Sequence, residues 1–352
     1  MKPILTAMSG GVDSSTAAWK LIQEGYECQG ATMKLFVPEE IGYAGFKPTA
    51  VPDAQKVCKQ LGIKHHTVEL IEEFKRLVLD RFAQTYLEGK TPNPCVFCNK
   101  HIKFGHLLQR AKEFGCGSLA TGHYARIESS TADGRYLLRK AADSTKDQSY
   151  VLYSLSQEQL SQIRFPLGNQ TKVETRRIAE QAGLAAAKKE ESQDLCFVPD
   201  GMYADLIEHY LHKVCPPGDF VDKTGKILGQ HKGIIRYTVG QRKGLGVAAK
   251  APYYVCSHNV TENQIVLASE ADLEKKYLTA HSINFIPFDT ITGTLHCKAK
   301  VRYRQPEKWA SVTQTGDNSI RVDFDEPETA VARGQSVVLY DGDYILGGGI
   351  ID

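Results

Sequence analysis

Two hydrophobic patterns follow each other along the chain. In roughly the first third, short apolar runs alternate with longer segments in which apolar residues recur every three to four positions. The short runs predict β-strands at residues 3–8, 26–34, 65–70 and 118–127. The longer segments predict helices at residues 14–24, 52–61, 72–87 and 102–114. The proline-rich residues 90–100 are expected to form a loop. This alternation is typical of a parallel sheet with crossover helices.

The rest of the chain changes from helical to alternating periodicity. Helices are predicted at residues 173–181 and 203–211, and residues 215–218 (Cys-Pro-Pro-Gly) are a candidate boundary. From about residue 280 the alternation is strict enough for a small β-barrel. Its clearest strands are expected at residues 298–304, 320–324 and 336–340. Along the chain, hairpin turns are expected at residues 133–134, 223–225 and 316–318. We expect an α/β fold with a parallel-sheet domain over residues 1–200, a small central domain over 201–278 and a β-barrel over 279–352.

A glycine-rich turn joins the first predicted strand to the first predicted helix. The run Ser9-Gly10-Gly11-Val12-Asp13-Ser14-Ser15 places glycines where positive φ or close backbone approach is needed. Unpaired N–H groups and the positive end of the helix dipole favour an anion there. Asp13 is placed to bind a metal or to cap the helix. The run lacks the Gly-Lys-Ser/Thr of a Walker A loop. It resembles the loop of enzymes that cleave ATP between its α and β phosphates; a glycine turn before a capped helix is the simpler alternative.

Composition and charge limit the classes of partner that the chain can bind and indicate its cellular compartment. The 352 residues carry a net charge of only +2, so an RNA-binding face would have to be local. No apolar stretch is long enough to span a bilayer, and the first residues lead directly into a strand rather than a signal peptide. The nine cysteines are an odd number. Together these features predict a cytoplasmic protein whose paired cysteines are more often catalytic or metal-binding than structural disulfides.

Three cysteines are candidates for chemistry. Cys95 and Cys98 form a C-x-x-C pair on the loop before a predicted helix, close to Lys103 and two further basic residues. A thiol in such a position is expected to have a lowered pKa and to be reactive. Cys196 has apolar neighbours, for which core packing is the default interpretation. One C-x-x-C pair without a second is weak evidence for structural zinc. The default for the remaining cysteines is burial; they are Cys28, Cys58, Cys116, Cys215, Cys256 and Cys297.

Several further motifs, taken in order, resemble one family. They are Ser9–Ser15, Thr91–Phe104, Ala120–Arg126, Lys146–Tyr150, Ser192–Val198, Thr238–Gly246, Val301–Arg304 and Ala332–Ser336. Their order and spread over nearly the whole chain resemble the bacterial tRNA-specific 2-thiouridylase (MnmA) family of PP-loop ATP pyrophosphatases. The resemblance implies an N-terminal PP-loop domain like those of the adenine nucleotide α-hydrolases, a central domain and a C-terminal barrel. It also implies an enzyme, a tRNA-uridine 2-sulfurtransferase, that modifies U34 of the tRNAs for Lys, Glu and Gln.

The resemblance also assigns site residues. Cys98 aligns with the family's nucleophile and Cys196 with its persulfide-carrying cysteine. The ATP-binding positions are Ala7, Met8, Ser9, Gly10, Gly11, Val12, Asp13, Ser14, Met33 and Gly122. The tRNA-binding positions are Asn93, Pro94 and Cys95 at the target base, together with His123, Lys146, Asp147, Gln148, Arg302, Tyr303 and Gln335. The loop Gly240–Gly246 is basic, and contact with phosphate and a simple hairpin turn are equally compatible with it.

One departure from the family pattern leaves two questions open. Better-known members carry Asp where this chain has Cys95, so an extra thiol lies near the chemistry. Either Cys95 or Cys98 can then be the attacking thiol. An alternative is that Cys95, Cys98 and Cys196 hold three irons of a [4Fe–4S] cluster whose fourth iron binds sulfide.

The implied chemistry activates a base and then replaces its oxygen. ATP, with Mg²⁺, would transfer AMP to the uracil oxygen and release pyrophosphate at the Ser9–Ser14 loop. Sulfur would arrive as a persulfide on Cys196 from a cysteine desulfurase or a sulfur-relay protein. Cys98 would release it and form a transient disulfide with Cys196, or would activate the base directly. A base in the anticodon loop is the easiest to extract. Other readings are a different PP-loop enzyme, such as GMP synthetase, argininosuccinate synthetase or a 4-thiouridine synthetase, and a non-catalytic metal-bound RNA-binding module.

Overall fold

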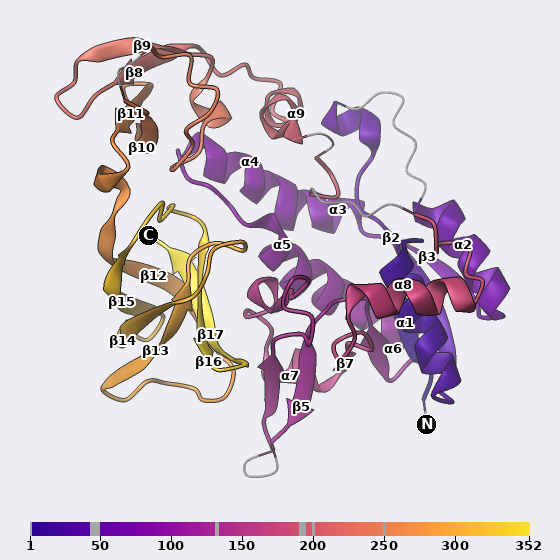
Figure 1. The fold of residues 1–352 in the computed structure, drawn as a ribbon. Helices are drawn as coiled ribbons and strands as arrows, with labels where there is room; N and C mark the ends of the chain where they lie inside the picture. The colour runs from indigo at the N-terminus through magenta and orange to yellow at the C-terminus, as the bar shows by residue number, and fades with distance from the viewer. Residues whose placement is uncertain (1, 43–49, 131–133, 190–194, 199–200, 249–250) are drawn as a thin grey trace. The chain divides into compact units, whose positions relative to one another are not determined.

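The chain divides into two compact units in the computed structural model (Figure 1). The structure describes residues 2–42, 50–130, 134–189, 195–198, 201–248 and 251–352. The first unit comprises residues 1–78, 95–201 and 342–345, and the second comprises residues 79–94, 202–341 and 346–352. Asp133 of one predicted turn and residues 192–194 of the motif at 192–198 lie outside the described residues.

A five-stranded parallel sheet forms the centre of the first unit. Its strands are β1 (Ile4–Ala7), β2 (Cys28–Lys34), β3 (His65–Glu69), β4 (Ser118–Ala120) and β7 (Ile163–Arg164). The spatial order is β3-β2-β1-β4-β7, with every neighbouring pair parallel. The strand order reverses between β1 and β4, and open parallel sheets bind their ligands outside the carboxyl ends of the strands at such a point. The predicted α/β fold with a parallel sheet is confirmed.

Helices and one hairpin complete the first unit. The α-helices are α1 (Val12–Gln23), α2 (Ala50–Leu61), α3 (Ile71–Phe74), α5 (Pro94–Phe97), α6 (Leu108–Glu113), α7 (Gln157–Ser161) and α8 (Lys172–Gln181). The π-helices are η2 (Lys75–Leu79) and η3 (Cys98–Leu107), the 3-10 helices are η1 (Pro38–Ile41) and η4 (Ser149–Val151), and the hairpin pairs β5 (Arg126–Ser129) with β6 (Tyr136–Arg139). Val12 of α1 packs on Ala179 of α8, which fixes the start of α1 against a second helix.

Two local predictions in this unit are wrong in an informative way. Residues 90–100 are not all loop, because a helix begins at Pro94 and carries both Cys95 and Cys98 onward into η3. Proline at the first helical position has no N–H to leave unpaired and a φ already suited to the helix, so it starts this helix rather than preventing it. The strand predicted at 118–127 ends at Ala120, and Gly122 lies in the loop that follows.

The second unit contains a four-stranded sheet and a closed barrel (Figure 1). The sheet, in the order β10-β11-β8-β9, comprises β8 (Gly218–Val221), β9 (Ile227–His231), β10 (Tyr254–Asn259) and β11 (Gln264–Ala268). The barrel strands are β12 (Lys275–Phe285), β13 (Thr294–Lys300), β14 (Lys308–Gly316), β15 (Ser319–Glu328), β16 (Ser336–Asp341) and β17 (Tyr344–Ile351). Pairing of β12 with β17 closes the barrel. The helices are α4 (Asp80–Leu87), α9 (Tyr203–Tyr210), η6 (Ile234–Arg236) and η7 (Ala271–Leu273).

The barrel core explains the alternating pattern of the sequence. Val312, Ile320, Val322 and Leu339 are fully buried inside it, because successive residues of a strand point to opposite faces. The predicted C-terminal barrel is therefore confirmed. One of its predicted strands is too long: β13 ends at Lys300, and residues 301–304 form a turn.

Candidate active site

The glycine-rich turn is shaped so that only glycine fits at its second position. It joins β1 to α1, at the point where the strand order reverses. Gly10 has φ +72°, and a Cβ atom there would lie 2.6 Å from Asp53 Cβ. Gly11 is the N-cap of α1 and, because it has no side chain, leaves the first N–H groups of the helix uncapped. The first N–H groups of α1 are therefore available to an anion. The suggestion that Asp13 caps the helix is wrong.

Serine hydroxyls hold this turn in shape. Ser14 Oγ and Ser15 Oγ both donate to the carbonyl oxygen of Gly11, at 3.2 and 2.8 Å. The N–H of Ser9 donates to Ser14 Oγ at 3.2 Å. The loop thus carries internal hydrogen bonds in addition to the uncapped N–H groups at the start of α1.

Asp13 is neutralised by a lysine from a distant helix. Lys172, the first residue of α8, is buried and lies with its Nζ 2.6 Å from Asp13 Oδ1. Tyr124 donates its hydroxyl to the same oxygen at 2.9 Å. Asp13 Oδ2 accepts no hydrogen bond from any described residue. Because Mg²⁺ is commonly bound by one or two carboxylates and the substrate phosphates, Asp13 fits the role of its protein ligand.

Lys172→Met is expected to lower the free energy of unfolding by about 1–3 kcal/mol, because the Asp13 carboxylate keeps its desolvation cost and loses its charged partner. Urea unfolding measures this change. In the double variant D13N/K172M the carboxylate is absent, so the loss should be smaller than in K172M alone. Equal losses in the two variants would show that the pair does not act as a pair.

The sheet brings the predicted ATP-binding residues to one edge. Ala7, Met33 and Gly122 lie at or just beyond the carboxyl ends of β1, β2 and β4, which are adjacent strands. A Cβ atom on Gly122 would lie 2.8 Å from the backbone nitrogen of Ser14. The loop after β4 therefore touches the glycine-rich turn, and only glycine permits that approach. Their role in binding ATP stays a prediction.

The three candidate thiols lie in the same unit and influence one another. Cys95 and Cys98 are one helical turn apart in α5 and η3, and each interacts electrostatically with Cys196. Cys98 is buried, Cys95 is half-buried and Cys196 is exposed. All nine cysteines of the chain fall within the described residues and are free thiols.

The predicted lowering of the thiol pKa is wrong. Burial raises the pKa of Cys98 to about 12, although Lys103 lowers it in part. Desolvation by the neighbouring protein, with Cys95 contributing, raises the pKa of Cys196 to about 11. Burial also raises the pKa of Cys95. Desolvation disfavours the charged thiolate and here outweighs the neighbouring lysine.

The three thiols are not placed to hold a [4Fe–4S] cluster. Within the parts of the chain that the structure describes, no three or more Cys, His, Asp or Glu side chains are placed to hold a metal ion. We therefore derive no step through a [4Fe–4S] cluster.

The comparisons with known proteins cover the chain almost end to end. The family model described as tRNA methyl transferase HUP domain matches residues 2–200. The models described as tRNA methyl transferase PRC-barrel domain and Aminomethyltransferase beta-barrel domain match residues 204–269 and 275–351. A protein named tRNA-specific 2-thiouridylase MnmA from Clostridioides difficile is 46% identical over 354 residues, covering 100% of this chain and 98% of its own length. Proteins of the same name from Acetivibrio thermocellus and Clostridium acetobutylicum are 45% and 43% identical, each covering 99% of both chains. The chain belongs to the MnmA family.

In this MnmA-family chain, the helix that carries Cys98 is held at two points. Gln159 donates its Nε2 to the carbonyl oxygens of Lys100 and Phe104, at 2.8 and 2.9 Å. Its Oε1 accepts from the N–H of Ser156, as part of the capping box of α7. Asn99, which is buried, donates Nδ2 to the Val151 carbonyl at 3.0 Å. These contacts fix the π-helical turn after Cys98.

Three of the positions predicted to contact tRNA also serve the fold of the first unit. His123 is buried, and its Nδ1 lies 2.6 Å from Thr121 Oγ1. Burial, with Lys103 nearby, holds the pKa of His123 well below its usual value, so the ring is neutral. Asp147 accepts from the N–H of Ala141 at 2.9 Å, and Gln148 accepts from the N–H of Tyr124 at 2.9 Å. Gln148 thereby supports the tyrosine that binds Asp13.

Two of the second-unit residues predicted to contact tRNA donate hydrogen bonds to backbone carbonyl oxygens. Gln335 donates its Nε2 to the carbonyl oxygens of Thr91 and Pro92, directly before Asn93 and Pro94. Arg302 donates to the carbonyl oxygens of Ala330 and Val239, at 3.0 and 2.6 Å. Tyr303 has 40% of its surface exposed. Contact of these residues with tRNA stays a prediction, as it does for Lys146 and the three residues described above.

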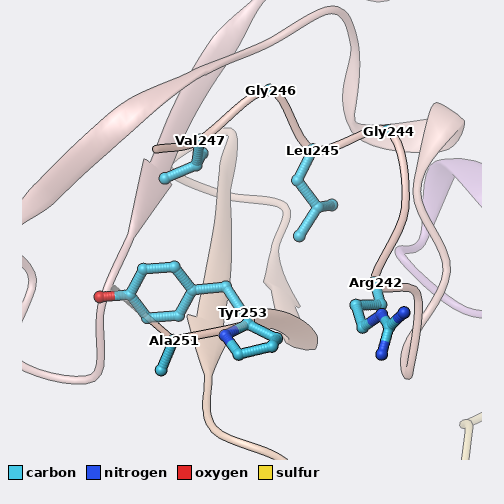
Figure 2. A pocket seen from close by; sticks show the side chains of 8 residues that line it. Arg242, Gly244, Leu245, Gly246, Val247, Ala251 and Tyr253 are labelled. Carbon is cyan, nitrogen blue, oxygen red and sulfur yellow. The ribbon is translucent and has the colours of Figure 1, made fainter. Parts of the chain in front are cut away.

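A pocket of about 380 Å³ lies in the second unit (Figure 2). One segment lines it: Arg242, Gly244, Leu245, Gly246, Val247, Ala251, Pro252 and Tyr253. It includes part of the basic loop Gly240–Gly246. No helix in the described part of this MnmA-family chain is long and apolar enough to cross a membrane.

The sequence did not reveal Lys172 or Tyr124 as partners of Asp13. Each reaches its partner through the tertiary fold, and a single sequence does not encode that pairing. The sequence signal nearest to Lys172 is the capping box Thr171-x-x-Glu174, which marks the first turn of α8 but not its partner.

Proposed function

We propose that this chain is a tRNA-uridine 2-sulfurtransferase that uses ATP to thiolate U34 in the tRNAs for Lys, Glu and Gln. The observation that carries the proposal is that Cys98 and Cys196, which are far apart in sequence, act electrostatically on one another in the unit that also carries the glycine-rich turn. Membership of the MnmA family supports the same activity. Activation of the base and delivery of sulfur then have their residues in one unit.

In the first step, uracil O2 attacks the α-phosphate of ATP, and pyrophosphate leaves. The Ser9–Ser14 loop, with the uncapped N–H groups at the start of α1, would bind the departing pyrophosphate, and Mg²⁺, when bound at Asp13, would supply charge neutralisation. The O2 atom becomes part of an adenylate, which is a much better leaving group than the original oxygen. Ala7, Met33 and Gly122 would hold the adenosine.

In the second step, sulfur passes from cysteine to the base. A cysteine desulfurase or a sulfur-relay protein would place a persulfide on Cys196. The Cys98 thiolate would attack Cys196 Sγ, forming the Cys98–Cys196 disulfide and expelling hydrosulfide. Hydrosulfide would add to C2, and AMP would leave with the former O2. A dithiol reductant would then restore both thiols. The alternative, in which Cys98 adds to the base directly, uses the same residues.

The remaining assignments follow the family. The target base would leave the anticodon loop and meet Asn93, Pro94 and Cys95. His123, Lys146, Asp147, Gln148, Arg302, Tyr303 and Gln335 would contact the tRNA. The domains would span residues 1–200, 201–278 and 279–352, and the protein would act in the cytoplasm.

A reconstituted reaction tests the proposal. The purified chain is incubated with ATP, Mg²⁺, cysteine, a cysteine desulfurase, a dithiol reductant and an unmodified tRNA transcript for Lys, and 2-thiouridine is measured by mass spectrometry of nucleosides. Pyrophosphate release should require the tRNA, and a transcript with cytidine at position 34 should give neither product. Tightly bound iron and sulfide in the active, anaerobically purified protein would replace the persulfide route by the cluster. Absence of 2-thiouridine, with pyrophosphate release independent of tRNA, would overturn the proposal.

A further inference from the structure

One lysine in the first unit is half-buried and unpaired. Lys103 lies in η3 and, among the residues that the structure describes, has no recorded hydrogen bond or ion pair. A lysine so placed gives up part of its hydration, and in folded proteins this loss is usually offset by a carboxylate. Within the described part of the chain, no carboxylate forms an ion pair with Lys103. An uncompensated cation of this kind is suited to meet an anion that forms during a reaction.

The π-helix determines which groups Lys103 meets. In an α-helix, a residue five positions on lies roughly 140° around the axis, because each residue turns the chain by about 100°. A π-helix pairs residues i and i+5 and takes more residues per turn, so position 103 returns closer to the face of Cys98. The hydrogen bonds from Gln159 to Lys100 and Phe104 hold that turn.

Lys103 acts electrostatically on a cluster of four groups. These are the thiols Cys95, Cys98 and Cys196 and the imidazole of His123. Burial raises the pKa of each thiol. Among the described side chains, Lys103 is the one that lowers the pKa of all three. Among the residues that the structure describes, the other groups that act on Cys98 are the two remaining thiols, which make its ionisation harder. His123 is neutral and adds no charge.

We propose that Lys103 is a positioning residue for sulfur transfer, whose ammonium group stabilises the anionic sulfur at Cys98 and at Cys196. The second half of this inference rests on the proposed function, because only a sulfur carrier has a persulfide at Cys196. The first half concerns the thiols alone. A buried thiol is a poor nucleophile until it loses its proton to solvent, and the nearby cation makes that loss easier.

Alkylation of the thiols tests the inference without ATP or tRNA. The full chain is treated with iodoacetamide between pH 6 and pH 10, and modification of Cys98 and Cys196 is followed by mass spectrometry of peptides. In Lys103→Met the rates at both thiols should fall about tenfold at a fixed pH, equivalent to a shift of about one pH unit in the profile. Lys103→Arg keeps the charge and should restore most of the rate. Cys196, which is exposed, gives the clearer signal.

The controls separate charge from structure. Lys112→Met removes an exposed lysine of α6 and should leave both profiles unchanged. Modification of Cys256 in the second unit should be the same in all variants. Lys103→Gln replaces Lys103→Met if the latter unfolds, as checked by circular dichroism. Superposable profiles for wild type and the uncharged variant would overturn the inference, whereas failure of thiolation with shifted profiles would count against the proposed function alone.

Discussion

Cys98→Ser is expected to abolish thiolation of tRNA while leaving tRNA-dependent release of pyrophosphate intact. Serine cannot form the disulfide that expels hydrosulfide, and its hydroxyl is a far weaker nucleophile than a thiolate. Removal of such a nucleophile typically costs about 10³-fold or more in rate. The measurement is 2-thiouridine formed per pyrophosphate released, with the same tRNA transcript. The ratio should fall from about one toward zero.

The matched control for this variant is Cys95, three residues earlier. Cys95→Asp introduces the residue that the family resemblance leads us to expect at this position. We expect this variant to remain active. If Cys95→Asp abolishes thiolation and Cys98→Ser retains it, the two thiols exchange roles. If Cys98→Ser thiolates at the wild-type rate, sulfur does not pass through Cys98.

Gly10→Ala is expected to remove ATP-dependent pyrophosphate release. The new methyl group would lie 2.6 Å from Asp53 Cβ and 2.9 Å from the backbone nitrogen of Ala54, so α2 or the turn must move. Either movement displaces the N–H groups that would hold the phosphates, and misplacement by about 1 Å can cost about 100-fold in rate. We expect a loss of at least that size, measured as pyrophosphate released in the presence of tRNA.

Gly25→Ala separates the clash from backbone strain. Gly25 has φ +84°, similar to Gly10, but a Cβ atom there meets nothing within 4 Å. Both variants should lose about 1–2 kcal/mol of stability from the left-handed conformation, whereas only Gly10→Ala should lose activity. Equal activities in the two variants would mean that the turn adapts to the extra methyl group.

The sequence predicted those parts of the molecule that short-range patterns encode. The Ser9–Ser15 turn follows a strand and opens a helix, as its glycines and polar residues indicate, and strict alternation after residue 280 predicted the barrel. The error at residues 90–100 arose because proline is found both in loops and at the first position of helices. Pro94 suggested a loop because prolines cluster there, but a proline also begins a helix well.

The chemistry of the thiols was harder to predict than their position. Lys103 is visible in the sequence, and its effect on Cys98 has the expected sign. The depth to which the helix buries Cys98 depends on the packing of distant segments, and that burial reversed the net direction. For the same reason the partners of Asp13, Tyr124 and Lys172, could not be foreseen from a motif that ends at Ser15.

The hydrogen bonds of Ser14 and Ser15 to the Gly11 carbonyl have a consequence for how ATP arrives. A phosphate loop that folds only around its ligand must lose conformational freedom on binding, and that loss weakens the complex. The bonds that hold the curvature of this loop are made within the loop itself and use no atom of a ligand. Little of the binding free energy of ATP is then needed to order it, so calorimetric titration with ATP should show a small entropic penalty.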